Sequence, residues 1–192
     1  MHLFGNRTRL LAGFLFPNGL VQAGIEFLAK AGTVLSETLK YEDTLARIID
    51  LVVPDIADGC VVRDFDGDHF RIALARHRNP DSQKRFQDLA TQSQQNKILL
   101  DFVQESFRTK KPIIVERSEE HFDLSSKMVP QLQEVCLLAG VKAFALIPLI
   151  LAGKNIGTLS LVIDESKRRF TDSDLPFLEE IATRVTFSLE NA

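Results

Sequence analysis

Residues 141–163 carry the clearest hydrophobic pattern in the chain, with two apolar runs on either side of a short polar break at residues 152–155. Gly153 lies in this break and can adopt a positive φ, so the pattern predicts two antiparallel strands joined by a tight turn. In the second run, large apolar residues alternate with smaller or polar ones: Leu159, Leu161 and Ile163 with Thr158, Ser160 and Val162. Such alternation gives a strand one apolar face for a packed core and a second, wetter face on which a small molecule would bind.

The rest of the chain predicts helices around a second hairpin. Apolar residues spaced by three and four positions indicate amphipathic helices over residues 20–39 and 41–56. The hairpin follows over residues 60–75, with its turn at residues 66–68. The later elements are one or two surface helices between 76 and 111, best defined over 96–109, a strand at 112–115, a charged loop at 116–127, a helix at 128–139 and a last helix from 171 to the end. This order predicts an α/β (α+β) fold with a largely antiparallel sheet, helices packed on one face and variable loops over the other.

Composition and charge narrow the function classes. The 192 residues are 45% hydrophobic and 26% charged with a formal net charge of -3, which is typical of a globular protein and gives no electrostatic footprint for nucleic acid. The apolar run at residues 10–16 is shorter than the roughly 20 residues that a membrane span needs. We therefore expect a leader at residues 1–19 and one domain at residues 20–192 of a cytoplasmic protein. Cys60 and Cys136 lie far apart and predict two reduced, buried thiols.

Six short motifs, taken in order, resemble a GAF domain, the small-molecule-binding sensor module of signalling proteins. They are TLARIIDL (44–51), DGC (58–60), IPLI (147–150), IGTLSL (156–161), RFTDSDL (169–175) and LENA (189–192). The resemblance runs from about Gly24 to the C-terminus. It implies a central antiparallel sheet with a helical layer on one face and a ligand pocket covered by loops and helices on the other.

The same resemblance implies a regulatory sensor in bacterial-type signal transduction, such as a two-component system. Such a domain binds a small molecule and relays its occupancy through the terminal helices to an output domain or partner protein, as part of a sensor kinase, cyclase or transcription regulator. Catalysis is not expected, because the four histidines (His2, His69, His77 and His121) are scattered and no pair has the spacing of metal ligands. There is also no glycine-rich phosphate loop.

The resemblance permits tests of particular cofactors. Bilin-binding members attach the chromophore through a cysteine followed by histidine, whereas Cys60 is followed by valine and Cys136 by leucine, which argues against a bilin. Members that bind cyclic nucleotides carry an Asn-Lys pair, then a Phe and an Asp-Glu pair. Here the corresponding residues are Ser166-Lys167, Phe170 and Asp174-Leu175, which argues against a cyclic nucleotide. The cofactor, if there is one, stays unknown.

Alternation along the strands predicts a polar cluster on the face turned away from the helical layer: Arg63, Arg71, Thr158 and Ser160. Two guanidinium groups and two hydroxyls suit an anionic metabolite, because arginine matches carboxylate and phosphate groups. The alternative is that these arginines are solvated or paired with Asp64 or Asp66. The remaining predicted lining residues are mostly apolar: Phe65, Phe122, Leu132, Val135, Cys136, Ala145 and Ile147.

The terminal helices provide a second functional hypothesis. In the family arrangement the first and last helices pack side by side, and the last helix, residues 171–192, is a candidate signalling or dimer helix. Its apolar residues recur at three and four positions, as a helix seam requires. We therefore predict a homodimer, with these residues at the seam: Phe27, Val34, Leu178, Ile181, Val185 and Leu189. The alternatives are that the stripe covers the domain's own sheet, and that the protein is a dimerisation or scaffold module with no ligand.

Overall fold

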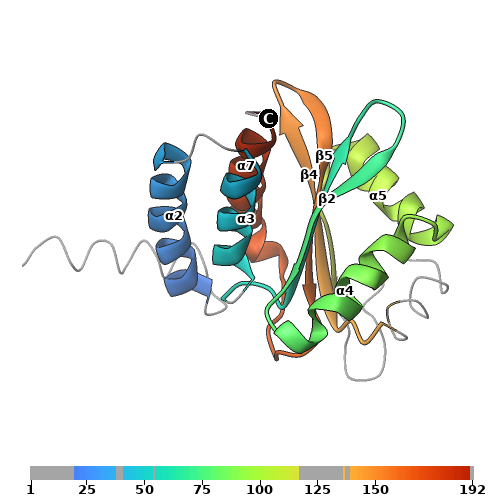
Figure 1. Cartoon of the computed structure of the whole chain (residues 1–192), viewed down its shortest axis with the longest axis horizontal. Coiled ribbons are helices and arrows are strands. Elements are labelled where there is room, and N and C mark those ends of the chain that lie inside the picture. The colour runs from blue at the N-terminus through green and yellow to red at the C-terminus, as the bar shows by residue number, and fades with distance from the viewer. Residues whose placement is uncertain (1–19, 38–40, 54, 117–135, 137–138, 191–192) are drawn as a thin grey trace, which may run out of the picture.

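The computed structural model describes residues 20–37, 41–53, 55–116, 136 and 139–190, and these residues form three layers (Figure 1). Helices α2 (Leu20–Glu37), α3 (Tyr41–Val52) and α7 (Leu175–Glu190) lie on one side of a central sheet. Helices α4 (Pro80–Ser93) and α5 (Lys97–Thr109) lie on the other side. Of the described residues, none belongs to a helix that is long and apolar enough to cross a membrane.

The sheet has five strands, and every neighbouring pair is antiparallel, in the order β2-β1-β5-β4-β3. The strands are β1 (Gly59–Phe65), β2 (Phe70–His77), β3 (Ile113–Glu116), β4 (Ala143–Leu151) and β5 (Lys154–Ile163). Both predicted hairpins are present, and the long β4–β5 pair lies inside the sheet. The prediction of an α/β (α+β) fold with an antiparallel sheet is therefore confirmed.

Local sequence explains how the chain turns between these elements. The side chains of Asn79 and Asn96 accept hydrogen bonds from backbone N–H groups in the first turns of α4 and α5, as N-cap residues do. In the β4–β5 turn, Ala152 has a φ of 47° and Gly153 a φ of 80°. Two positive φ values in a two-residue loop match the twist of the flanking strands. The predicted role of Gly153 is thus confirmed, and Ala152 adopts a conformation that usually favours glycine.

The main hydrophobic core lies between the sheet and α2, α3 and α7. Leu159, Leu161 and Ile163 of β5 point into it, as their alternation predicts. They pack with residues of α3 and α7, such as Ile48 and Ile181, and all five side chains are fully buried. Helix α2 lies on the outer side of α3 and α7, and the ring of its Phe27 meets the ring of Phe177 of α7 edge to face at 5.9 Å. Most of the buried hydrophobic residues among those described belong to this core.

The predicted dimer seam is wrong for four of its residues: Phe27, Leu178, Ile181 and Val185. The side chains of Phe27, Leu178, Ile181 and Val185 are buried in the domain's own core, and Leu189 packs against it. Their spacing at three and four positions reflects the single stripe by which a helix covers a sheet. The side chain of Val34 lies outside the described residues. A homodimer stays a prediction, but it needs a different surface.

Other differences between the prediction and the structure concern where the elements begin and end. Helix α3 ends at Val52 and is followed by a turn, four residues earlier than the hydrophobic pattern predicts. The surface helices are two, α4 and α5, and they pack against the sheet where variable loops were expected. The charged loop predicted at residues 116–127 lies outside the described residues except for Glu116, which ends β3, and most of the helix predicted at 128–139 also lies outside them.

Candidate functional site

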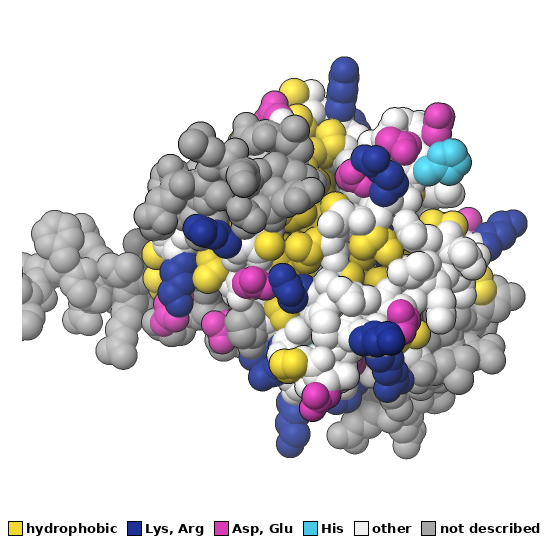
Figure 2. All heavy atoms as spheres, viewed as in Figure 1, with side chains coloured by type: hydrophobic (Ala, Val, Ile, Leu, Met, Phe, Trp, Pro, Cys, Tyr) yellow, Lys and Arg dark blue, Asp and Glu magenta, His cyan; other side chains and the backbone are white. Residues whose placement is uncertain are grey.

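A cavity of about 380 Å³ lies between the sheet and the layer formed by α4 and α5. Its walls are mostly apolar, from strands β1, β4 and β5 and from both helices: Val61, Leu146, Val162, Phe86, Leu99 and Phe102. In Figure 2, hydrophobic side chains come to the surface where the edge of the sheet meets α4 and α5, with charged groups of both signs around them. The volume and the lining are typical of a pocket for a small molecule.

Arg63 supplies the positive charge of this cavity. The pleat of β1 turns its side chain to the cavity face, while Cys60 and Val62 point into the main core. Its guanidinium donates from Nη1 to Ser160 Oγ at 2.9 Å and from Nη2 to Ser93 Oγ at 2.8 Å. Ser160 lies on β5 and Ser93 at the end of α4, so the arginine connects the sheet to the covering helix. The sequence predicted Arg63 and Ser160 on one face, and the structure brings them together.

The charge of Arg63 is buried without a described counter-ion. Only 6% of the residue is exposed, and no carboxylate oxygen of the described residues lies within 4.0 Å of its guanidinium. Burial disfavours the charged form and lowers the pKa of Arg63 to about 10. The side chain is still protonated at neutral pH. A buried cation whose partners are neutral hydroxyls is costly, and an anion in the cavity would compensate it.

Arg71 does not join this cluster, and the prediction that it shares a face with Arg63 is wrong. It is an exposed residue of β2 whose Nη2 donates to Asp64 Oδ2 at 2.6 Å. The reason is an irregularity in the β1–β2 register, where Val62 pairs with Leu74 but Arg63 pairs with Ile72. Strand β2 has one extra residue at this point. Its residues between this point and the hairpin turn therefore lie on the opposite face from the one that simple alternation predicts. The alternative pairing of this arginine with Asp64 is what the structure shows.

Two other predicted lining residues are also on the wrong face. Ala145 and Ile147 of β4 are fully buried in the main core, because they pair with Leu161 and Leu159 of β5. Strand β4 is apolar on both faces, so its sequence gives no sign of which face meets the cavity. Phe144 and Leu146 occupy the cavity face instead.

The remaining predicted lining residues have mixed placements. Phe65 packs against Phe70 and Phe107, with ring centroids 5.0 and 4.7 Å away. Thr158 of β5, which pairs with Arg63, is fully buried, and no hydrogen bond to its Oγ1 is present among the described residues. Cys136 lines the cavity. Phe122, Leu132 and Val135 lie outside the described residues.

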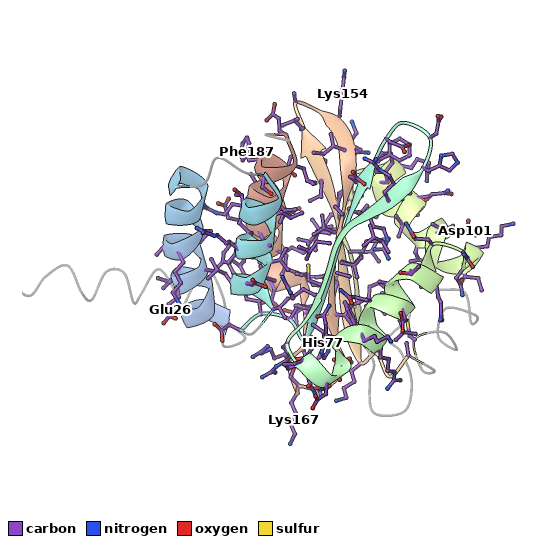
Figure 3. The ribbon with its side chains drawn as sticks, viewed as in Figure 1. Glu26, His77, Asp101, Lys154, Lys167 and Phe187 are labelled. Atoms are coloured by element: carbon purple, nitrogen blue, oxygen red, sulfur yellow. The ribbon has the colours of Figure 1, made fainter. Side chains whose placement is uncertain are left out.

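The far end of the cavity carries the opposite charge. Asp164, just beyond β5, lines the cavity, and its Oδ1 lies 3.2 Å from His77 Nε2. The other ring nitrogen, His77 Nδ1, lies 3.1 Å from the backbone N and 3.3 Å from the carbonyl oxygen of Asn79. Figure 3 shows His77 at one end of the sheet beside α4, and Lys154 at the opposite tip.

Asp58 braces this end of the site. It is fully buried, and its Oδ2 accepts backbone N–H groups of Asp164, Glu165 and Ser166 at 3.1, 2.9 and 2.6 Å. Its Oδ1 accepts from Arg78 Nη1 at 3.1 Å. Burial alone would raise the pKa of Asp58, but the hydrogen bonds from Ser166, Arg78 and Asp164 outweigh it and hold the pKa below its usual value. The sequence places Asp58 in the DGC motif (58–60) but gives no sign of this bracing role.

The arrangement is suited to binding. Burial raises the pKa of the Cys136 thiol to about 12, so this cavity-lining cysteine is protonated at neutral pH and is a poor nucleophile. Of the described residues, no group of three or more His, Cys, Asp or Glu side chains could hold a metal ion. What the cavity offers is an apolar wall with one buried cation at one end and one carboxylate at the other.

Solved structures share this fold at low sequence identity. One is a far-red absorbing protein in its dark state with bound biliverdin IXα: identity is 14%, the TM-score is 0.59, and 86% of this chain and 98% of that chain are covered. The GAF domain of the Acinetobacter phosphoenolpyruvate-protein phosphotransferase is 13% identical, with a TM-score of 0.59 and coverage of 88% and 94%. Free methionine-R-sulfoxide reductase from Neisseria meningitidis, in complex with its substrate, is 14% identical, with a TM-score of 0.58 and coverage of 88% and 91%.

The first of these structures corrects the cofactor prediction. The absence of histidine after either cysteine led us to argue against a bilin, and that exclusion is wrong, because a domain of the same fold holds biliverdin. A missing Cys-His pair speaks against one mode of attachment and does not exclude the pigment. The argument against a cyclic nucleotide stays a prediction.

Sequence comparison assigns the family. No curated protein is similar enough in sequence to count as a relative. The family profile described as GAF domain matches residues 38–190, which is most of the chain. GAF domains are typically regulatory sensor modules and are generally non-catalytic, although one neighbour above is a reductase. The chain belongs to the GAF domain family.

Proposed function

We propose that this GAF domain is a ligand-responsive regulatory domain that binds a small anionic molecule in the cavity beneath α4 and α5. The observation that carries the proposal is Arg63, a buried guanidinium with hydroxyl partners on the wall of an apolar cavity. Burying a charge without an opposite charge is unfavourable, and an anionic ligand supplies the missing partner. Occupancy is relayed through α2 and α7 to an output domain or a partner protein in bacterial-type signal transduction.

The relay is supported by how the strands are shared between the two faces. On β5, Ser160 faces the cavity while its neighbours Leu159 and Leu161 are fully buried in the core with α7. Arg63 has the same relation to Val62 on β1. A ligand that moves Arg63 or Ser160 therefore moves residues that pack against the helical layer. A ligand shifts such an equilibrium only by its different affinity for the two arrangements.

Native mass spectrometry of the purified full chain tests the binding. We expect extra mass under native conditions that is released on denaturation, in wild type and in Arg71→Gln, but is absent from Arg63→Gln. Arg71→Gln is the matched control because it removes an exposed arginine of the same sheet. A ligand-free wild-type protein would contradict the proposal and favour the scaffold alternative. The same spectra count the protomers, and the absorption spectrum of the released molecule shows whether it is a bilin.

Hydrogen exchange tests the relay. The amides of α7 are compared in the protein as purified and in the same protein refolded from denaturant without small molecules. We expect slower exchange in the last turns of α7 when the cavity is occupied, because the shared strands are then held in one arrangement. Equal exchange of α7 in both samples, together with slower exchange in α4 and α5, would leave binding in place and contradict the relay.

A further inference from the structure

The guanidinium of Arg63 still has donors for a ligand. It carries five N–H groups, and the bonds to Ser160 and Ser93 use two of them. The hydroxyl group of Ser93 donates its proton to the carbonyl oxygen of Ala90 at 2.5 Å, so Ser93 Oγ can only accept a hydrogen bond from the arginine. Ser160 also accepts from Arg63 and keeps a proton that it can donate. An anionic group beside Arg63 would therefore find free N–H groups of a planar guanidinium, which suits bidentate contacts, and the hydroxyl proton of Ser160.

The number of charges limits the ligand. Among the described residues that line the cavity, Arg63 is the only one with a lysine or arginine side chain. One cation neutralises one negative charge. A phosphate monoester carries about two negative charges at neutral pH, and the second would stay unpaired among apolar side chains. The cavity therefore fits a singly charged group better than a doubly charged one.

The far end of the cavity excludes a second anionic group. Ser160 and Asp164 lie on the same face, four residues apart, which is about 13 Å along an extended chain. Val162, Val61 and Phe86 line the wall between these two ends. Asp164 brings a carboxylate to this end of the cavity, and its Oδ1 lies 3.2 Å from His77 Nε2. The second carboxylate of a long dicarboxylic acid would face this like charge.

From this arrangement we infer that the ligand is a monocarboxylate or similar single anion on an apolar body, with its charged group at Arg63 and its body along Val61, Phe86 and Val162 toward Asp164. The inference rests on the proposed function, because it concerns the same cavity. It adds the charge of the ligand, the orientation of the ligand and the rejection of a second negative charge. An uncharged or cationic group is tolerated at the end near Asp164.

Titration calorimetry with matched eight-carbon probes at about pH 7.5 tests the inference on the dialysed full chain. The probes are octanoate, octanamide, octyl phosphate, suberate and 8-aminooctanoate, which differ only at their ends. We expect octanoate and 8-aminooctanoate to bind at least about tenfold more tightly than the other three, a difference of about 1.4 kcal/mol. Arg63→Gln should lose this preference for octanoate over octanamide, and Arg71→Gln should keep it.

Each result separates this inference from the function on which it rests. Octanamide binding as tightly as octanoate, or octyl phosphate or suberate binding more tightly, would overturn the single-anion assignment while the cavity remained a binding site. Equal octanoate affinity in wild type and Arg63→Gln would overturn the orientation. If no probe binds and the purified protein holds no small molecule, the inference and the proposed function both fail.

Discussion

The two faces of the central sheet are built in contrasting ways from the same strands. The face toward α2, α3 and α7 is one continuous apolar core. The face toward α4 and α5 has two small clusters, one around Val115 and Cys136 and one around Val61, Phe86 and Ala90. The cavity lies between them and carries the buried arginine. Successive side chains of a strand point to opposite faces of the sheet. One face can therefore form the stabilising core while the other face forms a binding site.

The contrast should be largest for matched leucine deletions on the two faces. Leu161 of β5 is fully buried in the main core, whereas Leu146 of β4 borders the cavity. We expect Leu161→Ala to lower the free energy of unfolding by about 3–5 kcal/mol and Leu146→Ala by about 1–2 kcal/mol, because Leu146 already has empty space on one side.

Urea denaturation of both variants measures the difference. Equal losses would contradict the division of the sheet into a stabilising face and a binding face. Octanoate affinity supplies the converse control: Leu161→Ala should retain it under conditions where the variant is folded, and Leu146→Ala should weaken it.

A smaller effect is expected from Asp58, which braces the end shared by both faces. Asp58→Asn keeps the shape but loses the charge that accepts three backbone N–H groups and Arg78. We expect a loss of about 2–3 kcal/mol at pH 7. The folded-state pKa of Asp58 is lowered, so its charged form stabilises the fold above the unfolded pKa of about 4, and this contribution is lost as the pH falls through the folded value.

The measurement is the unfolding free energy of both proteins between about pH 7 and pH 2.5. The difference between wild type and Asp58→Asn should be constant above about pH 5 and should shrink below about pH 4. A difference that stays constant down to the lowest pH would mean that the asparagine acts through packing and not through the lost charge.

The sequence predicts the stabilising face better than the binding face, and particular residues show why. Leu159, Leu161 and Ser160 were placed correctly, because a strand with one apolar face carries its own facing signal. Arg71 was misplaced by the register irregularity after Val62, which no local pattern reveals. Ala145 was misplaced because β4 is apolar on both sides. The face of the sheet on which such a residue lies depends on which strands pair and on the register of the pairing.

The position of the two helices that cover the cavity was the hardest feature to predict from the sequence. The sequence predicts one or two surface helices in this region, and Leu99, Phe102 and Val103 have the spacing of one apolar helix face, which in α5 is turned to the cavity. What that face covers depends on how the chain crosses the sheet after β2, which the helix itself does not encode. Ser93 was therefore missed as a partner of Arg63, although it ends α4 directly above the sheet.

The smallest change in stability is expected from the residue that matters most for binding. Arg63→Met replaces a buried cation by an apolar side chain of similar length and leaves Ser160 and Ser93 in place. It loses two hydrogen bonds, each worth about 1 kcal/mol, and removes the cost of burying an uncompensated charge, which is of similar size or larger. We therefore expect the free energy of unfolding without ligand to change by less than about 1 kcal/mol or to rise.

This expectation separates a binding arginine from a structural one. A structural arginine at this position would lose about 3–5 kcal/mol on substitution, since a buried partner would be left unpaired. Urea denaturation of wild type and Arg63→Met, each with and without octanoate, distinguishes the two roles. Octanoate should stabilise only the wild type, by an amount that grows with its concentration, because a ligand stabilises only a state that binds it. A protein that keeps a destabilising cation on its cavity wall gives up stability there for binding, and Arg63→Met measures how much.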